Sequence, residues 1–292
     1  MLIDTHCHLD ALEFSSDRLA VIERARAAGL AAIVIPSVAR SNFDKVRDLA
    51  HSFEMGAYAL GIHPMCVPRA SDDDLLALES RIKAAIDDPR FVAIGEIGLD
   101  FFIPELKEPE FRIKQERFYT AQLDLALRYE LPVLLHVRRS QDVLLKHLRR
   151  RSRIGGIAHA FNGSFQQADE FLKQGFAFGF GGAMTFTRAL QIRRLASQLP
   201  LDSLVLETDA PDIAPAWLEG PLASTSGRVV DNGQAVRRLP ARNEPAEVAG
   251  IGTALSGLRQ MPRAAIAAAT TKNAQRVMPR LARLLSLPKR PA

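Results

Sequence analysis

The stretch FVAIGEIGL, residues 91–99, is apolar along almost its whole length and carries a single acidic residue, Glu96. Such a run, with no alternation of polar and apolar positions, is typical of a strand that is buried on both faces of a parallel sheet. Helices must then cover that sheet. Glu96 is the unusual residue, because burying an unpaired carboxylate is costly.

Other short apolar runs of similar character occur at 2–6, 31–38, 56–63, 132–137, 155–161, 175–182 and 203–209. Between them lie stretches with helical patterning, for example 16–29, 71–86 and 111–129, and two closing helical segments follow at 245–260 and 262–285. Strands that alternate with helices predict a parallel sheet. About eight such units in a chain of this length predict an α/β fold of the (β/α)8 TIM-like barrel type, with a doubly wound α/β sheet as the alternative. We expect residues 1–292 to form a single domain.

One segment breaks this rhythm, residues 211–245, which is rich in proline, glycine and serine. A long irregular connection of this kind is usually a functional lid or a disordered loop. Because it follows the last predicted strand, we expect it near the mouth of the active site.

The composition is that of a globular chain able to bury a core, with 47% hydrophobic and 24% charged residues. The formal net charge of +5 permits a polyanionic partner, but much of the excess lies in the run 146–153 and in the tail, where a solvated surface is the simpler explanation. Cys7 and Cys66 do not make a disulfide framework. No signal-like leader or membrane-length apolar run is present, so we expect a cytoplasmic protein with no membrane contact.

Ionisable residues follow most of the predicted strands at their carboxyl ends. They are His6, His8, His63, Glu96, His136, His159 and Asp209. Taken singly, each could be a hydrogen-bonded core residue, a salt-bridge partner or a helix cap. In a barrel, however, all carboxyl ends of the strands open on one mouth, and the two histidines of an HxH pair on a strand point to the same side. Together these side chains could supply ligands for two divalent ions.

The motifs also resemble a known family, the TatD-type metal-dependent hydrolases, usually called TatD deoxyribonucleases, within the amidohydrolase-like barrels. The resemblance rests on DTHCHLD (4–10), GIHP (61–64), IGEIGLD (94–100), PVLLHVR (132–138), HAFNGS (159–164), ETDAP (207–211), RNEP (242–245) and ATTKNAQRV (269–277). These motifs occur in the family's order along nearly the whole chain.

The resemblance implies a metal site of two ions. His6, His8 and Asp209 would hold the first ion, His136 and His159 the second, and Glu96 would bridge both. Asp209 would also accept the proton of the attacking water, so that Asp209 and Glu96 are the expected catalytic residues. Histidine-rich coordination favours Zn, Mn, Co or Ni, with Mg possible.

Three further residues are predicted to contact a substrate phosphate, namely His63, Arg138 and Arg242. The chain departs from the family pattern in other places. Met65 stands where many relatives carry a second histidine, Asn162 where they often have Thr or Ser, and the stretch 224–240 looks inserted. None of these departures falls on a predicted metal ligand.

The favoured function is therefore a divalent-metal-dependent deoxyribonuclease, an exonuclease that acts on DNA ends or single strands with water activated by two metal ions. The alternative is hydrolysis of a small ester, lactone or amide on the same barrel, since fold and metals do not distinguish the two. A non-catalytic binding factor is a third reading, against which stands the complete set of predicted ligands. No obligate protein partner is evident in the sequence.

Overall fold

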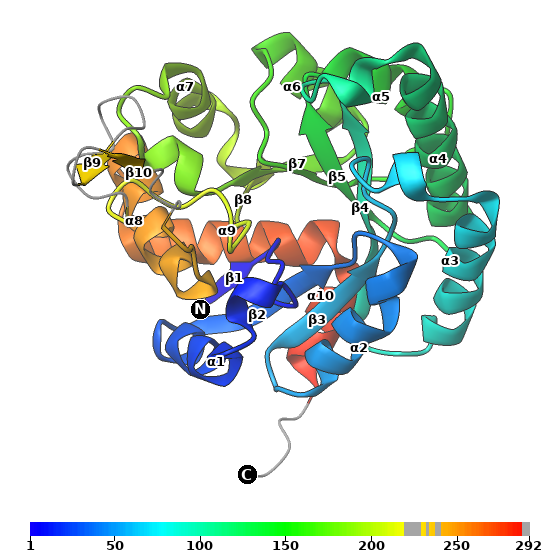
Figure 1. Cartoon of the computed structure of the whole chain (residues 1–292). Helices are drawn as coiled ribbons and strands as arrows, with labels where there is room; N and C mark the ends of the chain where they lie inside the picture. The colour runs from blue at the N-terminus through cyan, green and yellow to red at the C-terminus, as the bar shows by residue number, and fades with distance from the viewer. Residues whose placement is uncertain (219–228, 232–233, 237–240, 288–292) are drawn as a thin grey trace.

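Eight parallel strands form one sheet that curves into a nearly closed barrel (Figure 1). The computed structural model describes residues 1–218, 229–231, 234–236 and 241–287. The strands are β1 (Leu2–Asp4), β2 (Leu30–Pro36), β3 (Gly56–Leu60), β4 (Phe91–Asp100), β5 (Val133–Arg138), β6 (Gly156–His159), β7 (Phe176–Phe180) and β8 (Leu204–Leu206), neighbours in that order. The predicted TIM-like barrel is thereby confirmed, and the doubly wound alternative is excluded, because a doubly wound sheet reverses its strand order.

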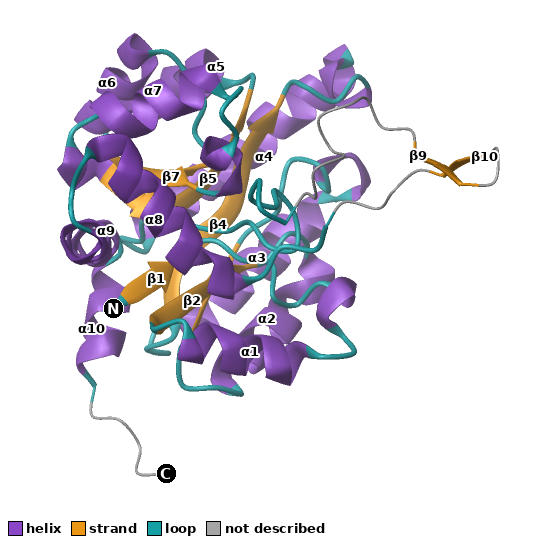
Figure 2. Ribbon diagram, turned by 90° about the vertical axis from the view of Figure 1, so that its left-hand side faces the viewer, coloured by secondary structure: helices purple, strands orange, loops and turns teal. Residues whose placement is uncertain are grey.

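Helices surround the barrel on its outside (Figure 2). They are α1 (Arg18–Ala27), α2 (Phe43–His51), α3 (Asp72–Ala85), α4 (Pro109–Arg128), α5 (Gln141–Leu148), α6 (Phe165–Lys173), α7 (Leu190–Gln198), α8 (Val248–Arg259), α9 (Arg263–Val277) and α10 (Pro279–Ser286). The closing segment predicted at 262–285 is divided into α9 and α10 at Pro279. Proline lacks the amide hydrogen that a continuing helix needs but is well tolerated in a first helical turn.

The core has two apolar layers, one between strands and helices and one inside the barrel. The strand members of the inner layer are Ile3, Ala32, Val34, Ala57, Ala59, Val92, Ala93, Leu134, Ile157, Ala177 and Val205. Met278 and Leu281 pack into the same layer, and the Arg280 guanidinium donates to the carbonyl of Phe91 at the start of β4. The beginning of α10 therefore closes the amino-terminal end of the barrel.

The seam between β1 and β8 joins the two ends of the sheet. Both the amide and the hydroxyl of Thr5 donate to the carbonyl of Leu206, at 3.1 and 3.0 Å. The buried carboxylate of Asp4 accepts from the amide and the hydroxyl of Thr208, at 3.0 and 2.6 Å. Burial raises the pKa of Asp4 to about 8, against the opposing effect of these hydrogen bonds. The seam thus brings together residues 204 positions apart in the chain.

The irregular segment predicted at 211–245 is described only in part. Two short strands, β9 (Val229–Asp231) and β10 (Gln234–Val236), pair antiparallel within it, while residues 219–228, 232–233 and 237–240 lie outside the described part of the chain. Its role at the mouth, and the assignment of 1–292 to one domain, stay predictions. Over the described residues, no helix combines the length and apolar character needed to cross a bilayer.

Candidate metal centre

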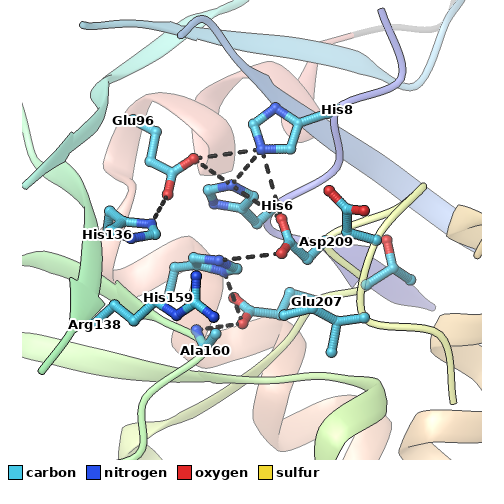
Figure 3. A network of polar contacts seen from close by, with 12 residues as sticks. His6, His8, Glu96, His136, Arg138, His159, Ala160, Glu207 and Asp209 are labelled. Atoms are coloured by element: carbon cyan, nitrogen blue, oxygen red, sulfur yellow. Dashed lines mark hydrogen bonds and ion pairs between the residues drawn. The ribbon is translucent and has the colours of Figure 1, made fainter. Parts of the chain in front are cut away.

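The carboxyl ends of the strands open into a cavity of about 1390 Å³. Its walls include His8, Glu96, His136, His159 and Asp209, whose polar atoms converge in Figure 3. These residues come from five different strands or from the turns that follow them. The structure thus brings these five predicted site residues together at the mouth of the barrel.

Strand periodicity explains why several of these side chains point inward. Leu134 and Ile157 belong to the inner apolar layer, and His136 and His159 follow each of them by two positions. Residues two apart on a strand share a face. On each of these two strands, the inward face therefore carries an apolar core residue first and a histidine two positions later.

Glu96 reaches the interior through an irregularity in β4. The register between β4 and β5 shifts between Ile94 and Ile97, and both of these isoleucines lie in the outer apolar layer although they are three positions apart. An extra residue in a strand re-aims the side chains beside it. The shift turns Glu96 toward the barrel axis, where its side chain is 1% exposed.

His6 and His8 lie just after β1 and point to the same place. Their Nε2 atoms are 3.3 Å apart, and they lie 3.1 and 3.4 Å from Oε2 of Glu96. The same two nitrogens lie 3.7 and 3.6 Å from Oδ1 of Asp209. The expected first group of His6, His8 and Asp209 is thus brought together, with one oxygen of Glu96 beside it.

The second oxygen of Glu96 faces a different pair of histidines. Its Oε1 lies 2.9 Å from Nδ1 of His136 and 3.3 Å from Nε2 of His63. These two nitrogens are 3.0 Å apart. Glu96 therefore stands between two sets of imidazoles, one on each carboxylate oxygen.

His159 stacks on His6, with ring centroids 3.9 Å apart, whereas its ring centroid is 6.5 Å from that of His136. Its Nε2 lies 3.6 Å from Oδ2 of Asp209. Of the two histidines expected to hold the second ion, His136 thus lies closer to His63, and His159 closer to His6. The assignment of His136 and His159 to one ion stays a prediction.

Three groups in the described chain have ligand atoms within 4.8 Å of one another, as one metal ion requires. They are His6, His8 and Asp209; His6, Glu96 and His159; and His63, Glu96 and His136. The donor set of imidazole nitrogens and carboxylate oxygens fits first-row divalent cations such as Zn²⁺ or Mn²⁺. Nitrogen and oxygen lone pairs that converge in a buried place are stabilised by a cation or by shared protons between them, so the residues present fit a metal centre.

Electrostatics keep the carboxylates of the cluster ionised. Burial raises the pKa of Glu96, but the charges of His63 and His6 outweigh it and hold that pKa well below its usual range. The pKa of Asp209 is shifted in the same direction. Burial raises it, but the charge of His159 outweighs burial, and the pKa falls to about 2. Burial lowers the pKa of His6 and His63. Burial also opposes protonation of His8, His136 and His159, but neighbouring carboxylates outweigh it and raise the pKa of all three, that of His8 to about 9. Metal binding would therefore displace protons from these imidazoles.

Sequence reasoning missed two buried carboxylates that orient the histidines. Oε1 of Glu207 lies 3.0 Å from Nδ1 of His159, and Oδ2 of Asp100 lies 3.2 Å from Nε2 of His136. In each case the opposite ring nitrogen is left to face the cluster. Both acids belong to the motifs ETDAP and IGEIGLD, and Glu207 lies two positions before Asp209, so strand periodicity could have found it.

The residues predicted to bind phosphate fall in different places. His63 and Arg138 line the cavity. Arg242 is not among the lining residues, and its guanidinium binds Asp17 at 2.7 and 2.8 Å and Glu244 at 2.8 Å. A phosphate contact by Arg242 therefore stays a prediction, which would require these ion pairs to open.

The two remaining histidines of the chain, in α2 and α5, lie apart from the cluster. His51 pairs with Asp88 and His147 with Glu116. Cys7 points away from its histidine neighbours, with Sγ 3.8 Å from the carbonyl of Ala210, and its thiol is fully buried. Burial raises the pKa of Cys7, so this cysteine is an unreactive core residue.

Comparison with known proteins gives a consistent result. The family described as TatD related DNase matches residues 3–279. An Escherichia coli protein, YjjV, described as an uncharacterised metal-dependent hydrolase, is 38% identical over 93% of this chain and 95% of its own length. Its crystal structure superimposes with a TM-score of 0.80, covering 95% of this chain and 98% of that one, at 37% identity.

Two other relatives extend the comparison. A Haemophilus influenzae metal-dependent hydrolase is 36% identical over 84% of this chain and 93% of its own length. A human protein named deoxyribonuclease TATDN3 is 28% identical, over 97% of each chain. The similarity thus extends over the whole barrel rather than over one motif.

Proposed function

The chain belongs to the family of TatD-related DNases and is a metal-dependent hydrolase, and from that premise we propose that it is a deoxyribonuclease that cleaves phosphodiesters at the ends of DNA strands. The human relative named a deoxyribonuclease supports the choice of substrate. We further propose that two divalent ions bind per chain, of the kinds that imidazole ligands favour, Zn, Mn, Co or Ni.

The observation that carries this proposal is the position of Glu96. Its two oxygens face two separate sets of imidazoles, His6 and His8 on one side and His63 and His136 on the other. A carboxylate placed in this way can give one oxygen to each of two cations. Its negative charge would partly offset their mutual repulsion.

Bound divalent ions would lower the pKa of a water toward neutrality and offset the charge that develops on a phosphodiester. The chain's own residues supply the rest. Asp209 is ionised at neutral pH and lies beside both His8 and His159, so it is placed to accept the proton of the attacking water. His63 and Arg138, on the cavity wall, can donate to the non-bridging oxygens of the phosphate.

The shape of the site favours a strand end as the substrate. The candidate metal ligands lie inside the barrel mouth, with Glu96 and His6 almost inaccessible to solvent. A terminal nucleotide can enter such a recess, whereas the interior of a duplex is too wide to do so. This shape supports the proposal that cleavage is exonucleolytic.

The test is an assay with purified, metal-reconstituted enzyme. End-labelled single-stranded DNA, the same sequence as RNA, and a panel of small esters and lactones are offered separately with Zn²⁺, Mn²⁺ or Mg²⁺. We expect stepwise shortening of DNA from one end. Rapid turnover of an ester or lactone with no shortening of DNA would refute the proposed nuclease and support the alternative function, hydrolysis of a small substrate.

A further inference from the structure

An aromatic side chain stands exposed in the wall of the polar cavity. Phe102, two residues after β4, has 42% of its surface accessible and lines the cavity. The guanidinium carbons of Arg138 and Arg139 lie 4.0 and 4.7 Å from the centroid of its ring. Both arginines line the same cavity.

One buried carboxylate connects the turn that carries the ring with the candidate metal ligands. Oδ1 of Asp100 accepts from the amides of Phe102 and Ile103, at 2.8 and 3.1 Å. Oδ2 of the same residue lies 3.2 Å from Nε2 of His136 and 3.7 Å from Nη1 of Arg138. Asp100 thus sets the turn that carries the ring and the orientation of a candidate ligand together.

Charge divides the cavity into two sides. Arg69 after β3, Arg138 at the end of β5 and Arg139 directly after it line the side on which Phe102 lies. Asp10, Glu13 and Asp212, from the connections after β1 and β8, line the other side. An anionic substrate is therefore attracted to the side that carries the aromatic ring.

We propose that Phe102, with Arg138 and Arg139, forms a subsite that binds a nucleobase by stacking, next to the phosphodiester held at the metal cluster. This inference rests on the proposed function and specifies how its substrate is held. The guanidinium groups of Arg138 and Arg139 lie over the ring of Phe102, so a base would stack on the exposed part of the ring and on the guanidinium planes beside it. Such a surface accepts any base, because every base has a stacking face. The subsite therefore gives affinity for nucleotides without preference for one base.

The experiment distinguishes binding of the base from binding of the phosphate. Two single-stranded oligonucleotides are compared, one natural and one in which the two nucleotides at each end carry no base. We expect Phe102→Ala to raise KM on the natural oligonucleotide about 10- to 100-fold, the size found when a stacking aromatic is removed, and to leave KM on the abasic one within twofold. Phe102→Tyr keeps the ring and should restore KM.

Ile213→Ala is the matched control. Ile213 is also an exposed apolar residue of the cavity wall, with 37% of its surface accessible, but it follows β8 on the far side of the barrel. This variant should behave as wild type on both oligonucleotides. Thermal melts of all variants check that the fold is intact.

Equal effects of Phe102→Ala on both oligonucleotides, or wild-type KM for Phe102→Leu on natural DNA, would overturn the subsite while leaving the nuclease in place. Failure of wild-type enzyme to cleave either oligonucleotide, with bound metal verified, would instead refute the nuclease and the subsite with it.

Discussion

Nδ1 of His159 lies 3.0 Å from Oε1 of Glu207, and the same oxygen accepts the amide hydrogen of Ala160 at 2.7 Å. A carboxylate that holds the far nitrogen of a ligating histidine fixes its tautomer and orientation. With Nδ1 occupied in this way, Nε2 of His159 is the nitrogen that faces Asp209.

Removing that carboxylate should weaken the metal centre without touching a proposed ligand of it. We expect Glu207→Ala to lower metal affinity and turnover by about 10- to 100-fold, measured by calorimetric titration of metal-free protein and by the DNA assay. Glu207→Gln should retain most of both, because an amide oxygen can still accept from His159 and Ala160. Wild-type metal affinity in Glu207→Ala would show that Glu207 does not position this histidine.

Gly179 of β7 is predicted to be intolerant of any side chain. A Cβ there would lie 1.8 Å from Oε2 of the buried Glu207 carboxylate. We expect Gly179→Ala to cost about 1–3 kcal/mol of unfolding free energy, as overpacking of a core does, and to reduce activity by displacing Glu207. Gly257→Ala is the control, because a Cβ at Gly257 in α8 meets nothing within 4 Å. It should be neutral or stabilising by up to about 1 kcal/mol. Urea unfolding of both variants makes the comparison.

Glu96→Gln tests the bridging role directly. The substitution keeps the shape of the side chain and removes its charge. We expect a folded protein that binds fewer than two ions per chain and has lost nearly all activity. His8→Ala should weaken mainly the ion shared with His6 and Asp209. Elemental analysis of metal-equilibrated protein, with a thermal melt, measures this. If Glu96→Gln bound two ions per chain and kept near-native turnover, Glu96 would not be a bridging ligand and its role would be structural.

Salt dependence tests the phosphate contacts. Binding of single-stranded DNA should weaken with salt, with a logarithmic slope of about −0.7 per phosphate contacted. Arg138→Gln should reduce the steepness by about 0.7, if this partly exposed guanidinium neutralises one phosphate. Fluorescence anisotropy with a labelled oligonucleotide, at several salt concentrations, gives both slopes. A slope near zero for wild type would indicate a small neutral substrate.

The Asp17 carboxylate should make stability depend on pH in the acid range. Its hydrogen bond with Arg242 lowers the pKa of Asp17 to about 2, with Arg24 adding to the effect and desolvation opposing it. A folded-state pKa below the ordinary value gives a contribution that is complete above pH 4 and lost as the pH falls toward 2. We expect wild type to be more stable than Asp17→Asn at pH 6, by a difference that shrinks at pH 3. Urea unfolding of both proteins at both pH values measures this difference, and a difference that stays the same at pH 3 would contradict the linkage.

The barrel was predictable because buried parallel strands are apolar on both faces, and every such run in the sequence became a strand. The meeting of His6, His8 and Asp209 followed from the same source, since their positions at carboxyl ends need no knowledge of loops. Glu96 lies within β4, and its inward direction depends on the register shift between Ile94 and Ile97. The split of the last helical stretch at Pro279 was also readable in principle, from the missing amide hydrogen of proline.

Other features depend on contacts that no local pattern specifies. His63 meets Glu96 and His136 because the registers of neighbouring strands shift, between Tyr58 and Ala59 and again between Ile94 and Ile97. Arg242 pairs with Asp17, which is 225 positions away in the chain. Neither a strand shift nor a distant ion pair changes the hydrophobic period from which elements are predicted.

The seam between β1 and β8 would make a metal bound beside it a cross-link between the two ends of the barrel. His6 and His8 follow the first strand and Asp209 follows the last, so the pocket between them exists only after nearly the whole sheet has assembled. A nascent chain that ends before Asp209 lacks the pocket altogether. An ion held there binds the closed barrel and not the open chain, so its binding free energy adds to folding stability. A chelator should therefore lower the free energy of unfolding of the barrel, although it leaves the apolar core unchanged.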